Sequence, residues 1–420
     1  MKKRDILHYI WKYRMVAHDK LRTPSGKNIE ILNIGEEDGN IFRNGCVRID
    51  GCEREGDILV EPSEGDGSAA LCVVSPESPC PTDPDATLVI EPGKHFEDEF
   101  LAISCGKRPC EETINATDTL HTNSYLSRLL IERIEDKARR ITATHNLSDK
   151  RWEETLFRTL ARNFGFGIQG EAFEQWASIL DLTALGKHRD NLMQIEAVFF
   201  GQAGLLEPES IPEYYRVEAE RTPYYTELRK EYRFLATKFN LQQVDHKIWG
   251  GSGTPHLRIA RLAAMYHKGN VTLSGIAECD TLDELKRLLQ TPIGGYWSNR
   301  THFGGTTTTA KPESISTKHL HLLIINTIVP ILYSYGKHRK DNNLCNKAED
   351  HLHLLPPEDN GIIRTWEKMG LHANCAADSQ ALIQLKKEYC NKKRCLDCQF
   401  TYRYLKSLLG KYIDFTQLSN

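Results

Sequence analysis

The chain has 420 residues, more than one ordinary domain needs, so its length predicts two or three folding units. Its 40% hydrophobic and 26% charged residues are typical of globular proteins and exclude collagen-like, coiled-coil and mainly disordered chains. The formal net charge is only -3, but it is unevenly distributed. Residues 1–28 contain 8 basic and 2 acidic residues, whereas residues 29–118 contain 6 basic and 21 acidic ones. An acidic block therefore lies between basic ones.

The N-terminal residues 1–28 begin with a basic cluster, as a secretory signal does. Aromatic and basic side chains alternate after it, so the apolar core of about 7 to 15 residues that a signal needs is missing. We expect an amphipathic arm or helix here. The most apolar stretch, Leu320–Tyr335, is shorter than the roughly 20 residues that span a bilayer. With 12 unevenly spaced cysteines, the sequence predicts a reduced, cytoplasmic protein that makes no membrane contact.

Short β-like runs separated by Gly- and Pro-rich turns predict a small, mainly β domain over residues 29–118. The expected strands are Ile29–Ile34, Cys46–Ile49, Ile58–Val60, Ala70–Val74, Thr87–Ile90 and Phe100–Ile103. From Thr122 onward apolar residues recur at helical spacing, which predicts an α-helical domain over residues 119–420. The fold class is therefore α+β, with a small acidic, mainly β N-terminal domain followed by a large α-helical domain.

Helical periodicity and the Gly- or Pro-rich loops between periodic stretches set the bounds of the expected helices. These are Trp152–Asn163, Ala172–Leu180, Asn191–Leu206, Tyr224–Phe239, Thr254–His267, Thr281–Leu289, Lys318–Tyr335, Leu344–Leu354, Ile362–Met369 and Ser379–Tyr389. The helical domain ends in a basic segment rich in cysteine.

This segment places Cys390, Cys395 and Cys398 in a C-x4-C-x2-C pattern. Two thiolates two residues apart can converge on one ion from a tight turn, so the pattern indicates a metal site, with zinc as the first choice. Cys375 can supply the fourth ligand, and His372 is the nitrogen alternative. The same spacing occurs in one ferredoxin type, which makes an iron-sulfur cluster the second choice. The competing interpretation is a set of reduced structural cysteines beside a solvated basic face.

Five basic side chains accompany the cysteines. They are Lys386, Lys387, Lys392, Lys393 and Arg394. Nearby positive charge lowers a thiol pKa, so we expect these residues to favour thiolates. They are also the candidate contacts to nucleic acid, because phosphate binding rests on Lys and Arg. Another protein is the alternative partner. The aromatic and basic residues Tyr9, Trp11 and Lys12 can stack bases in the same way, although packing of these rings in the core explains them equally well.

One further cluster, Lys187-His188-Arg189-Asp190, contains a base and a cation that could bind an anion. It lies between two expected helices. A helix cap with ion pairs would use the same residue types, so the cluster has a structural interpretation beside the functional one.

Several blocks of the chain follow one another in a distinctive order. They read HYIWKYR, IERIEDKARRI, WEETLFRTLARNFGFGI, KHRDNLMQIEAVFFGQAGLL, EYRFLATKF, INTIVPILYSYG and DSQALIQLKKEYCNKKRCLDC. With these blocks the chain resembles, over nearly its whole length, the bacterial domain of unknown function 2851 family, typical of Bacteroides and its relatives. The resemblance implies a soluble bacterial cytoplasmic protein and makes the terminal cysteine triplet a family feature. Cys375 is not part of the family pattern.

The N-terminal domain of this family has a G-P-D-F stretch leading into a strand and a G-N-V-E-I-H-V strand after it. This order is similar to the divided metal site of restriction-type nucleases, in which carboxylates hold Mg²⁺ at the scissile phosphate. Alignment on the turn at 47–51 puts Ile41 at the Asp position, Leu59 at the acid position and Glu61 at the His position. Apolar side chains cannot ligate Mg²⁺, so the resemblance implies a degenerate nuclease-like domain.

Two functional hypotheses follow. In the first, the protein is a non-catalytic binding or scaffold protein, with a degenerate nuclease-like N-terminal domain and nucleic-acid contacts on its basic C-terminal segment. In the second, it is a metal-dependent nuclease in which Asp38, Asp57 and Glu61 serve as displaced Mg²⁺ ligands. A strongly acidic domain repels DNA unless a metal neutralises it, and this favours the first hypothesis.

Overall fold

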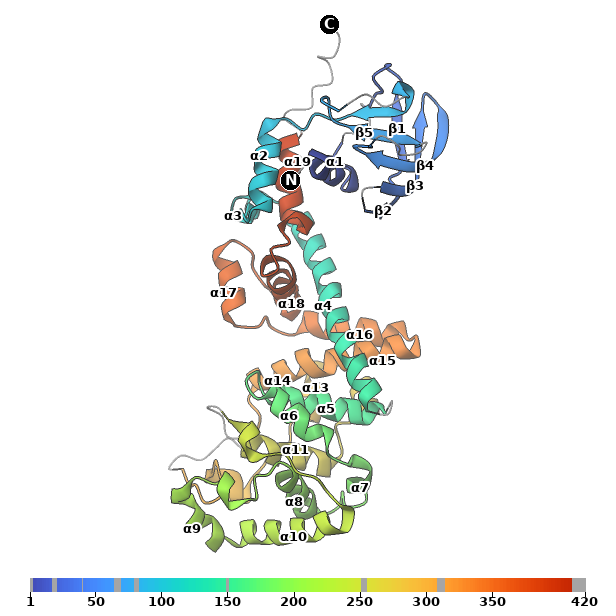
Figure 1. Cartoon of the computed structure of the whole chain (residues 1–420). Coiled ribbons are helices and arrows are strands. Elements are labelled where there is room, and N and C mark those ends of the chain that lie inside the picture. Colours follow the sequence, from blue (N-terminus) through green and yellow to red (C-terminus); the bar gives the residue numbers. More distant parts are fainter. Residues whose placement is uncertain are drawn as a thin grey trace. The chain divides into compact units, whose positions relative to one another are not determined.

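The computed structural model describes residues 3–16, 21–39, 41–63, 69–78, 83–148, 151–250, 255–307 and 314–409. It confirms the predicted α+β class, because a mixed sheet within residues 29–89 precedes a large helical region (Figure 1). The chain forms two compact units. The first consists of Met1–Tyr125, Arg364–Leu371 and Ile383–Asn420, and the second of Leu126–Ile363 and His372–Leu382. The C-terminal cysteine segment thus groups with the sheet, whereas the sequence had placed it in the helical domain.

The sheet of the first unit has the strand order β1-β3-β4-β5-β6, and β2 pairs with β3 at one end. Its strands are β1 (Ile29–Asn33), β2 (Glu36–Asp38), β3 (Ile41–Ile49), β4 (Cys52–Val60), β5 (Leu71–Val74) and β6 (Thr87–Val89). The pairs made by β3 are antiparallel, whereas β4, β5 and β6 run parallel to one another. Five of the six expected strands are therefore present, although β3 and β4 begin five and six residues earlier than expected and β2 was not expected.

The sixth expected strand, Phe100–Ile103, is wrong. These residues belong to helix α2 (Lys94–Ser104), in which Phe96, Phe100 and Ile103 are buried. Their spacing of four and three residues places them on one helical face. A short apolar run alone does not distinguish a strand from part of a buried helix. The packing of this face in the core decides in favour of the helix.

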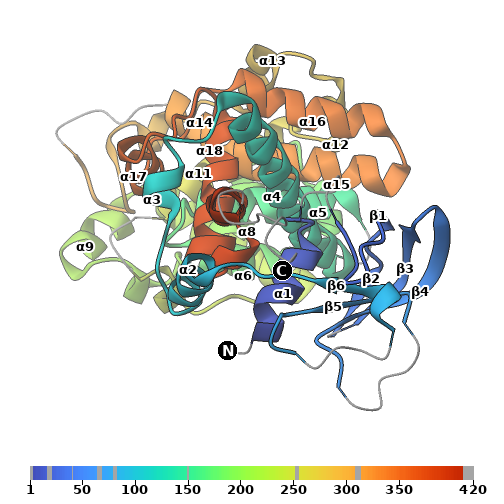
Figure 2. The same ribbon diagram turned by 90° about the horizontal axis from the view of Figure 1, so that it is seen from above.

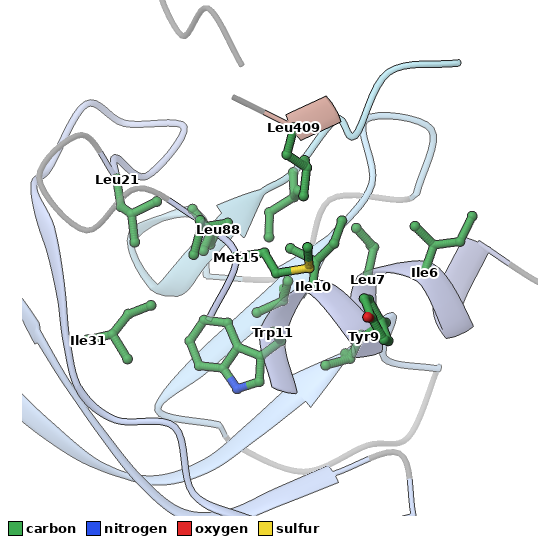
Figure 3. Packing of buried hydrophobic residues seen from close by; sticks show 14 of the residues in the cluster. Ile6, Leu7, Tyr9, Ile10, Trp11, Met15, Leu21, Ile31, Leu88 and Leu409 are labelled. Carbon is green, nitrogen blue, oxygen red and sulfur yellow. The ribbon is translucent and has the colours of Figure 1, made fainter. Parts of the chain in front are cut away.

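The core of the first unit lies between the sheet and helices from both ends of the chain. Helix α1 (Lys3–Lys12) lies alongside the sheet in both views (Figure 1 and Figure 2). The Trp11 ring lies among the other labelled core side chains (Figure 3). It is 1% exposed, and the indole N–H donates to the Ile34 carbonyl at 3.2 Å. Leu405 of α19 (Gln399–Leu409) joins the same core. The expected N-terminal helix is thus present, but Tyr9 and Trp11 are buried and do not offer their faces to nucleic-acid bases.

The remaining helices include every helix that the sequence predicted, together with several that it did not. They are α3 (Cys110–Thr113), α4 (Thr119–Leu147), α5 (Trp152–Phe164), α6 (Gly170–Ser178), α7 (Leu182–Gly186), α8 (Leu192–Gln202), α9 (Glu213–Arg221), α10 (Pro223–Phe239), α11 (His256–Lys268), α12 (Leu273–Glu278), α13 (Leu282–Leu289), α14 (Thr317–Leu323), α15 (Val329–Arg339), α16 (Asn342–Leu354), α17 (Gly361–Lys368) and α18 (Ala376–Gln384). Helices α3, α7, α9, α12 and α19 were not expected. Helix α9, for example, buries only Ala219 and therefore has no apolar face.

The expected helix Lys318–Tyr335 is interrupted by a π-helical segment, Ile324–Ile328, between α14 and α15. Pro330, the second residue of α15, has no backbone N–H to donate to the Asn326 carbonyl. The side-chain amide of Asn163 donates instead to the Asn326 carbonyl at 2.8 Å, which satisfies this group. Within the described residues, no helix is both long and apolar enough to cross a membrane.

Candidate functional site

The C-terminal cysteine segment is built on a sharp reversal of the chain. A π-helical segment, Leu385–Cys390, ends where Lys393 adopts the left-handed conformation, with φ of 56°. The Lys393 N–H donates to the Cys390 carbonyl at 3.2 Å, and the Arg394 N–H donates to the Tyr389 carbonyl at 2.9 Å. These two bonds form a Schellman motif, which satisfies the last carbonyls of a helix and turns the chain back. Cys395 consequently returns towards Cys390.

Four thiols line one small cavity of about 20 Å³ in the first unit. Cys390, Cys395 and Cys398 come from the C-terminal segment, and Cys110 begins the short helix α3. The other lining residues carry no carboxylate and no imidazole; they are Arg108, Pro109, Trp366, Leu385, Tyr389, Phe400 and Thr401. In the part of the chain that the structure describes, no three donor side chains already stand in a metal-coordinating arrangement. Ligation would require the thiols to rotate towards the cavity.

Burial dominates the acid-base properties of these thiols. Burial, followed by the neighbouring Cys398 and Cys110, raises the pKa of Cys390 to about 12, and Lys386 lowers it by less than either of these thiols raises it. Burial likewise raises the pKa of Cys110, followed by the effects of Cys398 and Cys395. The expectation that the basic residues make these thiols acidic is therefore wrong for the metal-free protein, because desolvation outweighs the nearby positive charge.

Cys375 and His372, the expected fourth ligands, belong to the second unit. The Cys375 sulfur lies 3.9 Å from Nδ1 of His353, and His372 is exposed. Their participation stays a prediction. Cys110 was missed because it precedes Cys390 by about 280 residues, and no spacing rule operates over such a distance. Only the packing of α3 against α19 brings it to the other thiols.

The candidate nucleic-acid contacts surround the reversal. Lys387, Lys392, Lys393 and Arg394 are exposed, and Lys386 is half-buried. Two of these residues form local ion pairs, Lys392 with Glu388 and Arg394 with Asp397. The Arg394 guanidinium also lies over the Tyr389 ring, 5.1 Å from its centroid. Arg108, an exposed residue from the segment before α3, adds a cation at the same cavity. These ion pairs and the ring contact fix the conformation of the turn that carries the basic residues.

The candidate carboxylates of the sheet share a cation. Arg43 lies 2.6 Å from Asp38 and 3.4 Å from Asp57, so one guanidinium serves both acids. Ile41 and Leu59 are direct partners in the register of β3 and β4. The two positions to which the family pattern assigns acids are therefore neighbours on one face of the sheet, but both carry apolar side chains.

Glu61 has a different role. It follows β4 with φ of 50°, and its carboxylate accepts a hydrogen bond from the Ser75 backbone N–H at 2.7 Å. The Ser78 hydroxyl donates to the other carboxylate oxygen. These bonds fix the loop after β5. Among the described residues, Asp38, Asp57 and Glu61 do not form a group that could hold a metal ion.

The comparisons with known proteins agree with the sequence blocks. One family model, described as "Protein of unknown function (DUF2851)", matches residues 4–66 and 95–361. The chain belongs to this family. The predicted membership is confirmed, but the match ends before the C-terminal cysteines. Neither the curated proteins nor the solved structures contain a match.

In this DUF2851 protein, the second unit contains a larger cavity of about 470 Å³ between α5, α7 and α11. Arg189, from the cluster Lys187–Asp190, lies at its rim. The Arg189 guanidinium donates to the Tyr266 carbonyl at 2.8 Å and stacks on the Tyr266 ring. His188 is held by Gln194, whose side-chain oxygen lies 2.7 Å from its Nδ1. These contacts hold both side chains in place, but they are not the helix cap and ion pairs of the structural interpretation. A role of the cluster in anion binding stays a prediction.

The second unit also buries a carboxyl group that the sequence analysis did not identify. Glu196 of α8 is 8% exposed, and burial raises its pKa to about 7, although a hydrogen bond from Tyr224 opposes this. The Tyr224 hydroxyl also accepts from the indole N–H of Trp297 at 3.0 Å. A lone acid within the apolar block IEAVFF was the available signal. It marks a polar network inside an apolar core.

Proposed function

We propose that this DUF2851 protein is a nucleic-acid-binding protein without catalytic activity of its own, and that the basic turn 391–394 contacts the phosphates. The proposal rests on the composition of the segment from Lys386 to Cys398, which contains five basic and two acidic residues. Lysine and arginine supply most of the phosphate-dependent affinity of such proteins. The backbone hydrogen bonds of Lys393 and Arg394 also fix the conformation of this turn, so binding would not have to order a flexible loop.

The backbone at Lys393 is the observation that favours a function for this charge. A left-handed residue at the end of a helix is usually glycine, because any Cβ is strained there. A lysine at such a position costs roughly 1 kcal/mol relative to glycine. Lys393 is exposed, and it makes no ion pair with any described residue. Since the side chain does not stabilise the turn, a role in binding explains its presence better than a role in folding.

The sheet offers no comparable surface. Asp38 is exposed and Asp57 is half-buried; the two acids share Arg43, and their charge would repel phosphates. The positions of Ile41 and Leu59 lack the acids that a nuclease of the proposed type needs. These arrangements support the degenerate nuclease-like domain over the alternative of a magnesium-dependent nuclease with displaced carboxylates.

The test is the salt dependence of binding to labelled 20-nucleotide single-stranded RNA, single-stranded DNA and duplex DNA, measured by fluorescence anisotropy. We expect the logarithm of the association constant to fall linearly with the logarithm of the salt concentration. The triple variant Lys392→Gln, Lys393→Gln and Arg394→Gln should reduce this slope by about 2 to 3 and weaken binding at least about tenfold at 0.1 M salt.

A second triple variant has the same net charge and provides the control. Lys187→Gln, Lys230→Gln and Arg233→Gln change exposed residues of the second unit. We expect it to bind like the unmodified protein. If the control loses as much affinity as the C-terminal variant, the basic turn is not the contact surface. If the unmodified protein binds none of the three nucleic acids, the proposal itself fails, and an acidic protein becomes the better candidate partner.

A further inference from the structure

The cavity beneath the basic turn combines four thiols from distant parts of the sequence with a volume of about 20 Å³. A cavity must offer about 10–15 Å³ to hold one water-sized sphere, so this one fits a single small guest. Its lining contains no hard oxygen ligand from Asp or Glu. Thiolates alone select soft or borderline ions such as zinc, and exclude magnesium and calcium.

We propose that the four thiols of this cavity bind one zinc ion tetrahedrally, with Cys110 as the ligand that the C-terminal triplet lacks. Structural zinc sites commonly use four cysteines, two of them two residues apart in a tight turn. Cys395 and Cys398 have this spacing across the 3-10 turn Cys395–Asp397, in which the Cys398 N–H donates to the Cys395 carbonyl at 3.0 Å. The inference does not depend on nucleic-acid binding, because metal content is a property of the chain alone.

The surroundings of the thiols also suit a metal-bound thiolate. The hydroxyl group of Tyr125 donates to the Cys398 sulfur at 3.6 Å, and such outer contacts orient metal ligands and stabilise their charge. Four thiolates around Zn²⁺ carry a net charge of -2. Arg108 lines the cavity, and its positive charge offsets part of this negative charge. Each thiol releases its proton to solvent when it binds the metal.

The size of the cavity favours a single ion over an iron-sulfur cluster. A cluster contains several metal and sulfide atoms, and a space of about 20 Å³ accommodates only one of them. A single ion also explains the geometry of the chain. It would connect α3 to the reversal at 390–395, and so fix the base from which the basic turn projects.

The first test measures metal in the full-length protein, purified without a histidine tag under anaerobic, reducing conditions. We expect about one zinc per chain by mass spectrometry. After exchange with cobalt, we expect the visible absorption of tetrahedral Co²⁺ and the ultraviolet charge-transfer absorption of four thiolates. Cys110→Ser should remove most of the bound metal. Cys375→Ser, the matched control in the second unit, should leave both the metal content and the spectrum unchanged.

Two results would overturn the proposal: protein that contains no zinc and takes up none on titration, or metal that is lost in Cys375→Ser and retained in Cys110→Ser. Iron with the visible absorption of a cluster would overturn the assignment to zinc. Because Cys110→Ser can unfold the first unit, a second measurement uses the unmodified protein. A strong chelator should increase the alkylation rates of Cys110, Cys390, Cys395 and Cys398 but not that of Cys375. Equal changes at all five would contradict the site.

Discussion

The hydroxyl group of Tyr125 donates a hydrogen bond to the sulfur of Cys398 at 3.6 Å, across 273 residues of sequence. The Tyr125 ring packs edge-on against Phe400, with the centroids 5.5 Å apart. Both contacts join the start of α4 to the segment that carries the thiols. Burial raises the pKa of Tyr125, and Cys398 raises it further, so the hydroxyl retains its proton and remains a donor. This hydrogen bond can be removed without disturbing the packing of the ring.

Tyr125→Phe should therefore destabilise the protein modestly while leaving it folded. The lost bond is worth about 0.5–1.5 kcal/mol, measured as a decrease in the free energy of unfolding in urea. If zinc is bound, its affinity should fall at least about tenfold, the usual effect of losing an outer contact to a metal ligand. Tyr335→Phe is the control, since the Tyr335 hydroxyl bonds to none of the described residues. An equal loss of zinc affinity in both variants would speak against a specific role for Tyr125.

Replacing Lys393 by glycine should change the stability of the protein and its affinity for nucleic acid in opposite directions. Lys393→Gly removes the left-handed strain at φ of 56°, so we expect the free energy of unfolding to rise by roughly 1 kcal/mol. Nucleic-acid affinity should fall, because a phosphate contact is lost. Lys340 has the same φ of 56° at the end of α15 and is also exposed, so Lys340→Gly is a closely matched control. It should gain similar stability in urea unfolding and keep full affinity in the anisotropy assay. If Lys393→Gly binds normally, the lysine is not a contact.

Glu61 provides a test of the sheet. Its carboxylate fixes the loop after β5 through Ser75 and Ser78, so Glu61→Ala should cost about 1–2 kcal/mol of stability. Incubation with Mg²⁺ or Mn²⁺ should produce no cleavage of single- or double-stranded DNA by the unmodified protein. Gel electrophoresis of labelled substrates provides the measurement. Cleavage that disappears in Glu61→Ala would instead support the nuclease hypothesis.

The sequence was sufficient to predict an element where the residues of that element alone determine its structure. Helix α13 (Leu282–Leu289) was predicted because apolar residues recur at helical spacing. In the structure, Thr281 forms a capping box with Glu284 at its start. The strand expected at Phe100–Ile103 failed because four apolar residues fit either structure. Only packing against the sheet decides in favour of the helix.

The candidate site could be predicted only in part, for the same physical reason. The pattern of Cys390, Cys395 and Cys398 is local, and the structure brings these three residues to one cavity. Cys110 reaches that cavity through tertiary packing, which one sequence does not encode in any spacing. The effect of burial on the pKa of the thiols also could not be predicted from the sequence. Five neighbouring basic residues suggested acidic thiols, but desolvation decides the pKa of Cys390.

The buried carboxyl group of Glu196 should make stability depend on pH. Its pKa is about 7 in the folded protein, against an ordinary value of 4.5, because burial disfavours the charged form. The folded state therefore holds this proton more tightly than the unfolded state does. The resulting stabilisation is complete below pH 4.5 and is lost as the pH rises to 7. The difference between the two pKa values corresponds to at most about 3 kcal/mol.

Glu196→Gln should remove this dependence, because the amide keeps an oxygen that accepts from Tyr224 but has no proton to lose. We expect the variant to be up to about 3 kcal/mol more stable than the unmodified protein at pH 8, and similar to it at pH 4.5. Urea unfolding at intervals between these pH values measures the effect. Glu227→Gln, which changes an exposed carboxylate of α10, should leave the profile unaltered. A profile for Glu196→Gln that parallels that of the unmodified protein would show that Glu196 is already ionised in the folded state.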